Sequence, residues 1–280
     1  MMHFLGVHLA RALLVVLNYT APFGLTVQRD LPYAQGEFHR LDVYSLDRSL
    51  DRPVIVYLYG GGWRGGSKGR AAYVGGVLAR RGFVVVIPEY RHAPQATLPD
   101  ILADHAAAVG WALAHAGEIG GDPRRVIVMG SSSGAWGAAM LALDPRWLAQ
   151  AGAKPGDLAG MVGLAGPYMI ASLTEQPDRD VFRETGPEME PIHHATGSHP
   201  PILLMTGTSD TDVLPIGTAT LAKRLRETHG PIETRYYVGL GHEDIVQALV
   251  YPFNRHVSVA DDIETFAKSL RVEDPHSALP

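Results

Sequence analysis

The chain has 280 residues, of which 46% are apolar and 19% are charged, a composition typical of a globular protein with a sizeable core. The net charge of −5 argues against nucleic-acid binding, which normally needs a basic surface. The absence of cysteine excludes disulfides, thiolate metal sites and a cysteine nucleophile.

The N-terminal segment contains an apolar run from Ala12 to Leu17, which follows His8 and Arg11. This run is shorter than the ~20 apolar residues that a membrane-spanning helix needs, so we expect no stable membrane span. We interpret residues 1–24 as an amphipathic helix that packs on the surface of the domain. We favour a soluble, cytoplasmic protein, and an uncleaved export signal or a contact with a membrane surface are the alternatives.

Downstream of this segment, predicted strands and helices alternate along the chain. Strands are expected at residues 41–44, 54–59, 83–90, 126–129, 202–206 and 233–238, and helices at 70–81, 98–116, 135–143, 215–229 and 259–270. The alternation indicates an α/β fold with a mostly parallel sheet and helices on both faces, in which sites form at the carboxyl ends of the strands. We expect residues 25–272 to form one domain and residues 273–280 a flexible tail.

The segment Gly130-Ser131-Ser132-Ser133-Gly134 lies between a buried strand and a helix. A reversal this sharp strains the central residue, and glycines two positions before and after it relieve the crowding. The pattern G-x-S-x-G in this context is a nucleophile elbow, with Ser132 as the exposed nucleophile. A phosphate-binding loop is excluded because no G-x-x-x-x-G-K-[ST] pattern is present.

A serine hydroxyl needs a base, and the base needs an acid that fixes its tautomer. In this kind of fold the chain order is serine, acid, histidine. Asp210 follows a predicted strand through a glycine turn, and His242 follows the next strand through Gly-Leu-Gly. Asp212 competes for the role of the acid, and we favour Asp210 because it lies nearer to the end of the strand.

Acyl transfer also needs backbone donors for the oxyanion. Gly60, Gly61 and Gly62 follow a predicted strand, and glycines let the backbone approach a substrate closely. We expect the N–H groups of Gly61 and Gly62 to form the oxyanion hole together with the N–H of Ser133.

These motifs together resemble the α/β-hydrolase esterases. The matching residues are Gly60-Gly61-Gly62-Trp63, PEYRHAP at 88–94, Gly130–Gly134, Asp210 and Gly241-His242. They are similar to hormone-sensitive-lipase-like carboxylesterases and to the kynurenine-formamidase and feruloyl-esterase-like branch, which RLDVY at 40–44 and GLAGPY at 163–168 also resemble. Over roughly residues 25–270, the resemblance implies an eight-stranded, mostly parallel sheet with antiparallel first strands, and hydrolysis of carboxylic esters. By position it implies a triad of Ser132, Asp210 and His242.

Two positions depart from the family pattern. Tyr59 stands where the family has a histidine before the glycines, and Glu89 begins the segment that the family writes as DYRLAPE. Arg91 in that segment is expected to be structural and to pair with Asp104 on the following helix.

The substrate pocket is less determined by sequence than the triad. Only residues 169–199 are available for a cap, so we predict a small cap and a pocket for small or short-chain acyl esters. The candidate wall residues, chosen by loop position, are Trp63, Trp136, Tyr168 and Met169.

Other functions with the same triad remain as alternatives. They are an amidase or arylformamidase-like enzyme, an acetyl or feruloyl polysaccharide esterase, and a non-catalytic ligand-binding hydrolase fold. We expect a small-molecule ester as the partner and no cofactor, because no dinucleotide fingerprint is present. The histidines His193, His194 and His199 lack the spacing of a metal site, so we expect no metal.

Overall fold

The structure is a computed structural model that describes residues 13, 15–47, 51–255, 257 and 259–270. It contains an eight-stranded sheet in the order β1-β2-β4-β3-β5-β6-β7-β8. The strands are β1 (Thr26–Pro32), β2 (Arg40–Ser45), β3 (Arg52–Leu58), β4 (Val84–Pro88), β5 (Gly121–Ser131), β6 (Gly160–Leu164), β7 (Ile202–Gly207) and β8 (Ile232–Tyr237). β2 pairs antiparallel with β1 and β4, and the other pairs are parallel.

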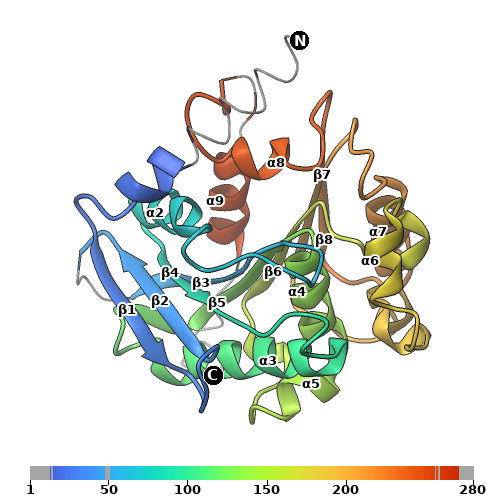
Figure 1. The fold of residues 1–280 in the computed structure, drawn as a ribbon, viewed down its shortest axis with the longest axis horizontal. Coiled ribbons are helices and arrows are strands. Elements are labelled where there is room, and N and C mark those ends of the chain that lie inside the picture. Colours follow the sequence, from blue (N-terminus) through green and yellow to red (C-terminus); the bar gives the residue numbers. More distant parts are fainter. Residues whose placement is uncertain (1–12, 14, 48–50, 256, 258, 271–280) are drawn as a thin grey trace, which may run out of the picture.

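Helices cover both faces of this sheet (Figure 1). Their bounds are α2 (Ala72–Arg80), α3 (Leu98–His115), α4 (Ser133–Leu143), α5 (Pro145–Ala149), α6 (Gln176–Asp180), α7 (Ile216–Glu227), α8 (Asp244–Gln247) and α9 (Val259–Ser269). Side chains of α2, α8 and α9 join one core cluster, and α3, α4 and α7 supply most of the helical side chains of the other. The two clusters use alternate residues of the central strands, because successive side chains of a strand point to opposite faces.

The local sequence explains why the helices start where they do. α3 begins with a capping box, in which the Thr97 hydroxyl accepts from the Asp100 N–H while the Asp100 carboxylate accepts from the Thr97 N–H. α4 has no charged residue and every one of its residues is buried, so it lies entirely within the core, directly behind the elbow.

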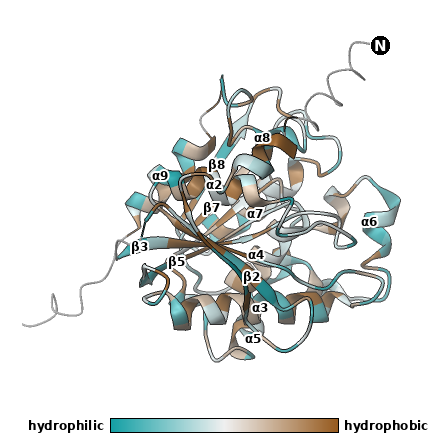
Figure 2. Cartoon of the chain, turned by 60° about the vertical axis from the view of Figure 1, so that its left-hand side comes forward, coloured by the Kyte–Doolittle hydropathy of each residue, from teal (hydrophilic) through white to brown (hydrophobic). Residues whose placement is uncertain are grey.

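A cap segment lies between β6 and β7. It consists of short 3₁₀ turns and α6, whose residues are largely hydrophilic (Figure 2). An isolated antiparallel bridge joins Leu173 to Val213, and the Thr174 N–H donates to the Asp212 carbonyl at 3.1 Å. The cap is therefore tied to the loop that follows β7.

The architecture confirms the predicted α/β-hydrolase fold. Two strands, β1 and β6, were not indicated by the hydrophobic pattern. β1 is a half-exposed edge strand with an irregular register, and β6 is a five-residue strand that begins with a glycine. The predicted pairing of Arg91 with Asp104 is confirmed, since two guanidinium nitrogens donate to the carboxylate at 2.9 and 2.7 Å.

The described part of the N-terminal segment packs on α2. Residues 15–20 are helical, and the Asn18 side chain accepts from the Tyr73 N–H at 2.9 Å. Arg80 donates to the carbonyls of Ala21 and Phe23. Residues 1–12 and 14 of the predicted amphipathic helix, and the predicted tail at 273–280, lie outside the described residues, so these domain bounds stay predictions. Within the described part of the chain, no helix has the length and apolar character to span a bilayer.

Candidate active site

The nucleophile elbow is a strained turn between β5 and α4. Ser132 has φ 51° and ψ −125°, a positive φ that non-glycine residues rarely adopt. A Cβ on Gly130 would lie 2.2 Å from the Gly134 carbonyl oxygen, and one on Gly134 would lie 2.0 Å from the Leu58 carbonyl oxygen. Both glycines are thus required by close backbone contacts. The Ser132 N–H donates to the Leu164 carbonyl at 2.9 Å, which ties the elbow to β6.

The structure brings Ser132, His242 and Asp210 together in one chain of hydrogen bonds. The Ser132 Oγ lies 2.9 Å from Nε2 of His242, and Nδ1 of the same ring lies 2.8 Å from Oδ2 of Asp210. The three residues come from the turns after β5, β8 and β7, respectively, which meet at one edge of the sheet (Figure 1). With Nδ1 protonated toward the carboxylate, the Nε2 lone pair faces the serine hydroxyl. This arrangement can remove a proton from Ser132.

The acidic residue in contact with the imidazole is Asp210 and not Asp212. The Asp210 side chain is fully buried, and its Oδ1 accepts the N–H groups of Asp212 at 3.0 Å and of Val213 at 2.9 Å. Asp212 is exposed and lines the pocket. The Asp210 carboxylate is therefore held in place from one oxygen while the other faces His242.

The electrostatic surroundings of His242 favour its protonated form. Burial lowers its pKa, but the hydrogen bond and the charge of Asp210 raise it, and the charges of Asp212 and Glu243 add to this effect. The net result is a pKa above the ordinary value of 6.5. The imidazole can thus hold the proton that it takes from a serine during a reaction.

The glycine loop after β3 lies directly against Ser132. A Cβ on Gly60 would lie 2.9 Å from the Ser132 Cβ, and Gly62 has φ 59°. Gly61 and Gly62 line the pocket, whereas Ser133 begins α4 and is buried. Within the described residues, the backbone N–H groups of Gly61, Gly62 and Ser133 have no hydrogen-bond acceptor. These donors are available for a ligand oxygen.

Tyr59 holds the start of this loop in place. This role of Tyr59 was not predicted from the sequence. Its hydroxyl donates to a carboxylate oxygen of Glu89, and its ring stacks on Tyr90 with centroids 4.3 Å apart. The Tyr90 hydroxyl donates to the Tyr59 carbonyl at 2.6 Å. The sequence contained two signals for this role. A tyrosine stands where the family has a histidine, and Glu89 lies at the end of the next predicted strand. A buried tyrosine and a half-buried carboxylate thus hold the strand end that the glycines follow.

A second serine also reaches the pocket. The Ser131 Oγ lies 2.8 Å from the Tyr57 hydroxyl, and burial raises the pKa of Tyr57 to about 12. Ser131 lines the pocket beside Ser132, and the sequence pattern had identified it only as a variable position of the elbow. Its hydroxyl is partnered by a neutral phenol and not by a base.

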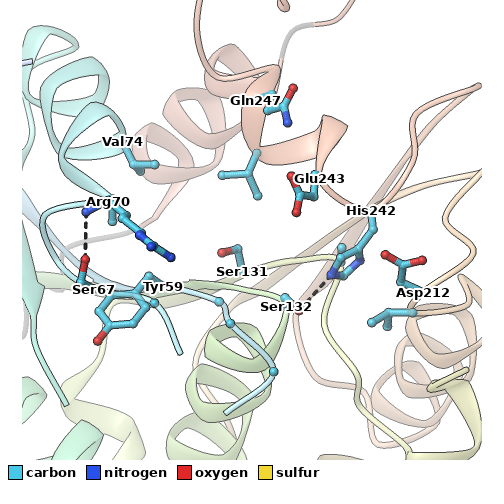
Figure 3. A pocket seen from close by; sticks show the side chains of 18 of the residues that line it. Tyr59, Ser67, Arg70, Val74, Ser131, Ser132, Asp212, His242, Glu243 and Gln247 are labelled. Carbon is cyan, nitrogen blue, oxygen red and sulfur yellow. Dashed lines mark hydrogen bonds between the residues drawn. The ribbon is translucent and has the colours of Figure 1, made fainter. Parts of the chain in front are cut away.

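The pocket over Ser132 has a volume of about 540 Å³. Its walls come from the glycine loop, the start of α2, the cap segment, the loop after β7, and α8 (Figure 3). The lining combines tyrosines and small apolar side chains with charged ones, the latter being Arg64, Arg70, Glu175, Asp178, Asp212 and Glu243. The site is therefore open to small polar or charged molecules.

The four wall residues expected from sequence are not among those that line this pocket, and that expectation is corrected. Trp63 and Trp136 are buried, pack edge to face at 5.6 Å, and both contact Phe182 of the cap. Tyr168 is fully buried, and Met169 is half-buried at the start of the cap. Trp63 and Trp136 thus join the cap to the core, and other residues form the pocket wall.

The histidines of the cap make local contacts. His194 Nε2 lies 2.8 Å from the Glu188 carbonyl, and His193 Nε2 lies 3.8 Å from a carboxylate oxygen of Glu190. Among the residues that the structure describes, no group of three or more histidine, aspartate or glutamate side chains is placed to hold a metal ion.

The chain is similar to proteins that are named as esterases. The family model BD-FAE matches residues 41–167. Isoprenylcysteine alpha-carbonyl methylesterase ICME of Arabidopsis thaliana is 27% identical over 252 residues, which are 81% of this chain and 59% of that protein. Esterase LipC of Mycobacterium tuberculosis is 29% identical over 199 residues, 62% of this chain and 48% of that protein. The chain thus spans about half the length of these relatives.

A solved structure with the same fold is inhibited esterase B from Lactobacillus rhamnosis. It is similar with a TM-score of 0.76 at 18% sequence identity, and the likeness covers 96% of each chain. At this level of identity the comparison concerns the fold, and the fold is that of an α/β-hydrolase.

Proposed function

We propose that this chain is a member of the hormone-sensitive-lipase-like branch of α/β-hydrolase carboxylesterases, and a serine carboxylic ester hydrolase acting on small or short-chain acyl esters. The observation that carries the proposal is the hydrogen-bond chain from Ser132 through His242 to Asp210 at the base of the pocket. The relatives named as esterases and as methylesterases support the same reaction class.

In the first half of the proposed reaction, the Ser132 oxygen attacks the carbonyl carbon while its proton moves to Nε2 of His242. The electron pair of the carbonyl bond moves to its oxygen, which the N–H groups of Gly61, Gly62 and Ser133 stabilise. When the tetrahedral intermediate collapses, the bond to the alcohol oxygen breaks, and His242 gives its proton to that oxygen. The alcohol leaves, and the acyl group stays on the serine.

In the second half, a water molecule attacks the acyl-enzyme and gives a proton to His242. Collapse of the second intermediate releases the carboxylic acid and returns the proton to Ser132. The balance is one ester and one water converted to one acid and one alcohol. The fixed contact with Asp210 keeps the imidazole in the same tautomer through both halves.

The preference for short acyl chains rests on the pocket. Its volume is about 540 Å³, and its purely apolar lining residues are alanines and valines, which stand among tyrosines and many polar side chains. A long alkyl chain gains free energy mainly by burying each methylene against apolar surface. A pocket with charged residues at several points of its wall offers little such surface.

A panel of p-nitrophenyl esters tests the proposal. The wild-type protein is expected to hydrolyse the acetate and butyrate faster than the palmitate, and to react covalently with a fluorophosphonate probe. Ser132→Ala is expected to lose about 10⁶-fold in kcat and all labelling, because no other group replaces the nucleophile. Ser131→Ala is the matched control and is expected to keep the labelling. Labelling that persists in Ser132→Ala would refute the assignment, and faster hydrolysis of palmitate would refute the short-chain preference.

A further inference from the structure

The pocket has two chemically different ends on either side of Ser132. Figure 3 shows His242 and Asp212 on one side of the nucleophile and Arg70 on the other, with Ser131 and Ser132 between them. The charges of Asp212 and Glu243 act on the imidazole, so these carboxylates belong to the histidine end. The other end, formed by the start of α2 and the residues just before it, carries the positive charge of Arg70.

The direction of proton transfer decides which half of an ester occupies each end. The group that leaves must receive its proton from Nε2 of His242, so the alcohol half lies toward the histidine end. The acyl chain continues from the other side of the same carbonyl carbon. It therefore extends from Ser132 toward the end of the pocket formed by the start of α2.

Arg70 at this end has a guanidinium group with no partner among the described residues. The hydrogen bonds of Arg70 come from its backbone, whose N–H donates to the Ser67 hydroxyl at 3.2 Å and to the Ser67 carbonyl at 3.1 Å. The other arginine of the pocket, Arg64, is already paired with Asp178 at 2.8 Å. The Arg70 side chain is exposed and points into the pocket toward Ser131 (Figure 3).

The pocket also has apolar and aromatic lining residues, and Figure 3 shows Val74 and Tyr59 beside Arg70. Ala71, Val74 and Val246 line it together with Tyr57 and Tyr59. A short chain of methylenes suits such a wall, and a planar guanidinium at its end matches a carboxylate in two hydrogen bonds. This end of the pocket thus offers apolar surface and an unpaired cation to the same acyl chain.

On the basis of the proposed ester hydrolysis, we propose that Arg70 is a specificity-determining residue that selects esters with a second carboxylate at the far end of a short acyl chain. The substrate class is the monoester of a small dicarboxylic acid with a neutral alcohol. The carboxylates at the histidine end disfavour an anionic alcohol half, since like charges repel.

The test compares three ethyl or butyryl esters by pH-stat titration. Monoethyl glutarate has the carboxylate in the acyl half, ethyl 5-methylhexanoate is its neutral isostere, and butyryl glycolate has the carboxylate in the alcohol half. The wild-type kcat/KM for monoethyl glutarate is expected to exceed that for each of the others by about tenfold, as for one charge-assisted contact. Arg70→Gln is expected to remove this preference while it still hydrolyses the neutral isostere, and Arg70→Lys to retain part of it.

Arg226→Gln is the charge-matched control, because it removes the same positive charge from an exposed side chain outside the pocket lining. It is expected to leave the ratio unchanged. A wild-type protein without the preference, or an Arg70→Gln variant that keeps it, would overturn the proposal while ester hydrolysis itself stands.

A binding measurement separates the two proposals. Calorimetry is expected to show that glutarate binds to Ser132→Ala and that the added Arg70→Gln change weakens binding about tenfold. Equal binding to the two variants would overturn the role of Arg70. Absence of all ester hydrolysis, with glutarate binding still dependent on Arg70, would overturn the proposed function alone.

Discussion

The reacting groups and the rim of the pocket are built in different ways. Ser132, Asp210 and His242 each follow a strand of the sheet, and their positions are fixed by backbone contacts and by buried hydrogen bonds. By the rim we mean the exposed charged side chains that line the pocket, such as Arg70 and Glu243. These two residues lie just before the first residues of α2 and α8. Under the proposed function, the scaffold would fix the reaction, and exposed rim residues would set the choice of substrate.

The largest expected difference in activity that tests this comparison is the one between variants of Asp210 and Asp212. Asp210→Asn is expected to lower kcat by about 10⁴-fold, because an amide in place of the carboxylate no longer fixes the reactive tautomer of His242. Asp212→Asn changes an exposed rim residue and is expected to lower kcat less than about tenfold. The measurement is steady-state hydrolysis of p-nitrophenyl butyrate at the pH optimum of each variant.

Equal losses in the two aspartate variants would contradict the distinction between reacting group and rim. The thermal unfolding of Asp210→Asn needs to be measured in parallel, since its carboxylate also accepts two backbone N–H groups. A variant that unfolds cooperatively and still lacks activity assigns the loss to the reaction.

The next largest effect concerns the backbone that holds the nucleophile. A Cβ at position 134 would lie 2.0 and 2.5 Å from the carbonyl oxygens of Leu58 and Tyr59, which belong to a buried strand and its end. Gly134→Ala is therefore expected to lower the free energy of unfolding by about 3 kcal/mol. Gly117→Ala is the control, because a Cβ at position 117 would have no atom within 4 Å, and a change within about 0.5 kcal/mol is expected.

Urea unfolding followed by circular dichroism measures both variants. Similar stabilities for Gly134→Ala and Gly117→Ala would show that the elbow is not constrained as its contacts indicate. In that case the contrast between a fixed scaffold and an exchangeable rim would no longer hold.

The same contrast explains what could be predicted from the sequence. The elbow is local: its glycines, its strand and its helix are contiguous, so Ser132 could be identified from a few residues. The positions of Asp210 and His242 followed from strand ends, which a parallel sheet brings to one edge. Asp210 was preferred to Asp212 because it lies nearer to the end of the strand.

The pocket wall could not be predicted in this way. It is assembled from segments that are far apart in the sequence, and nothing local distinguishes a tryptophan that lines a cavity from one that is buried. Trp63 and Trp136 pack with Phe182 of the cap, a long-range contact that depends on how the cap folds back. The role proposed for Arg70 likewise emerges only when its side chain is seen across Ser132 from His242 (Figure 3).

The smallest expected effect sharpens the comparison, because it measures how the rim acts on the reacting groups. The pKa of His242 is raised above 6.5 by Asp210 first, with further contributions from Asp212 and Glu243. Only the neutral imidazole can accept the serine proton, so kcat/KM rises with pH through a pKa above 6.5. Glu243→Gln removes one of the charges that favour the protonated form, and the acidic limb is expected to move to lower pH by a few tenths of a unit.

Stability has the opposite dependence on pH. A histidine whose pKa is raised by folding contributes stability that is fully present below its unfolded value of about 6.5 and is lost as pH rises through the folded value. Glu243→Gln is therefore expected to reduce this contribution at low pH and to leave stability above the folded pKa unchanged.

Glu227→Gln, an exposed change on α7 outside the pocket lining, is the charge-matched control for the pH profile of activity. An acidic limb that moves equally in both variants would mean that net charge, and not the rim, sets the pKa of the base.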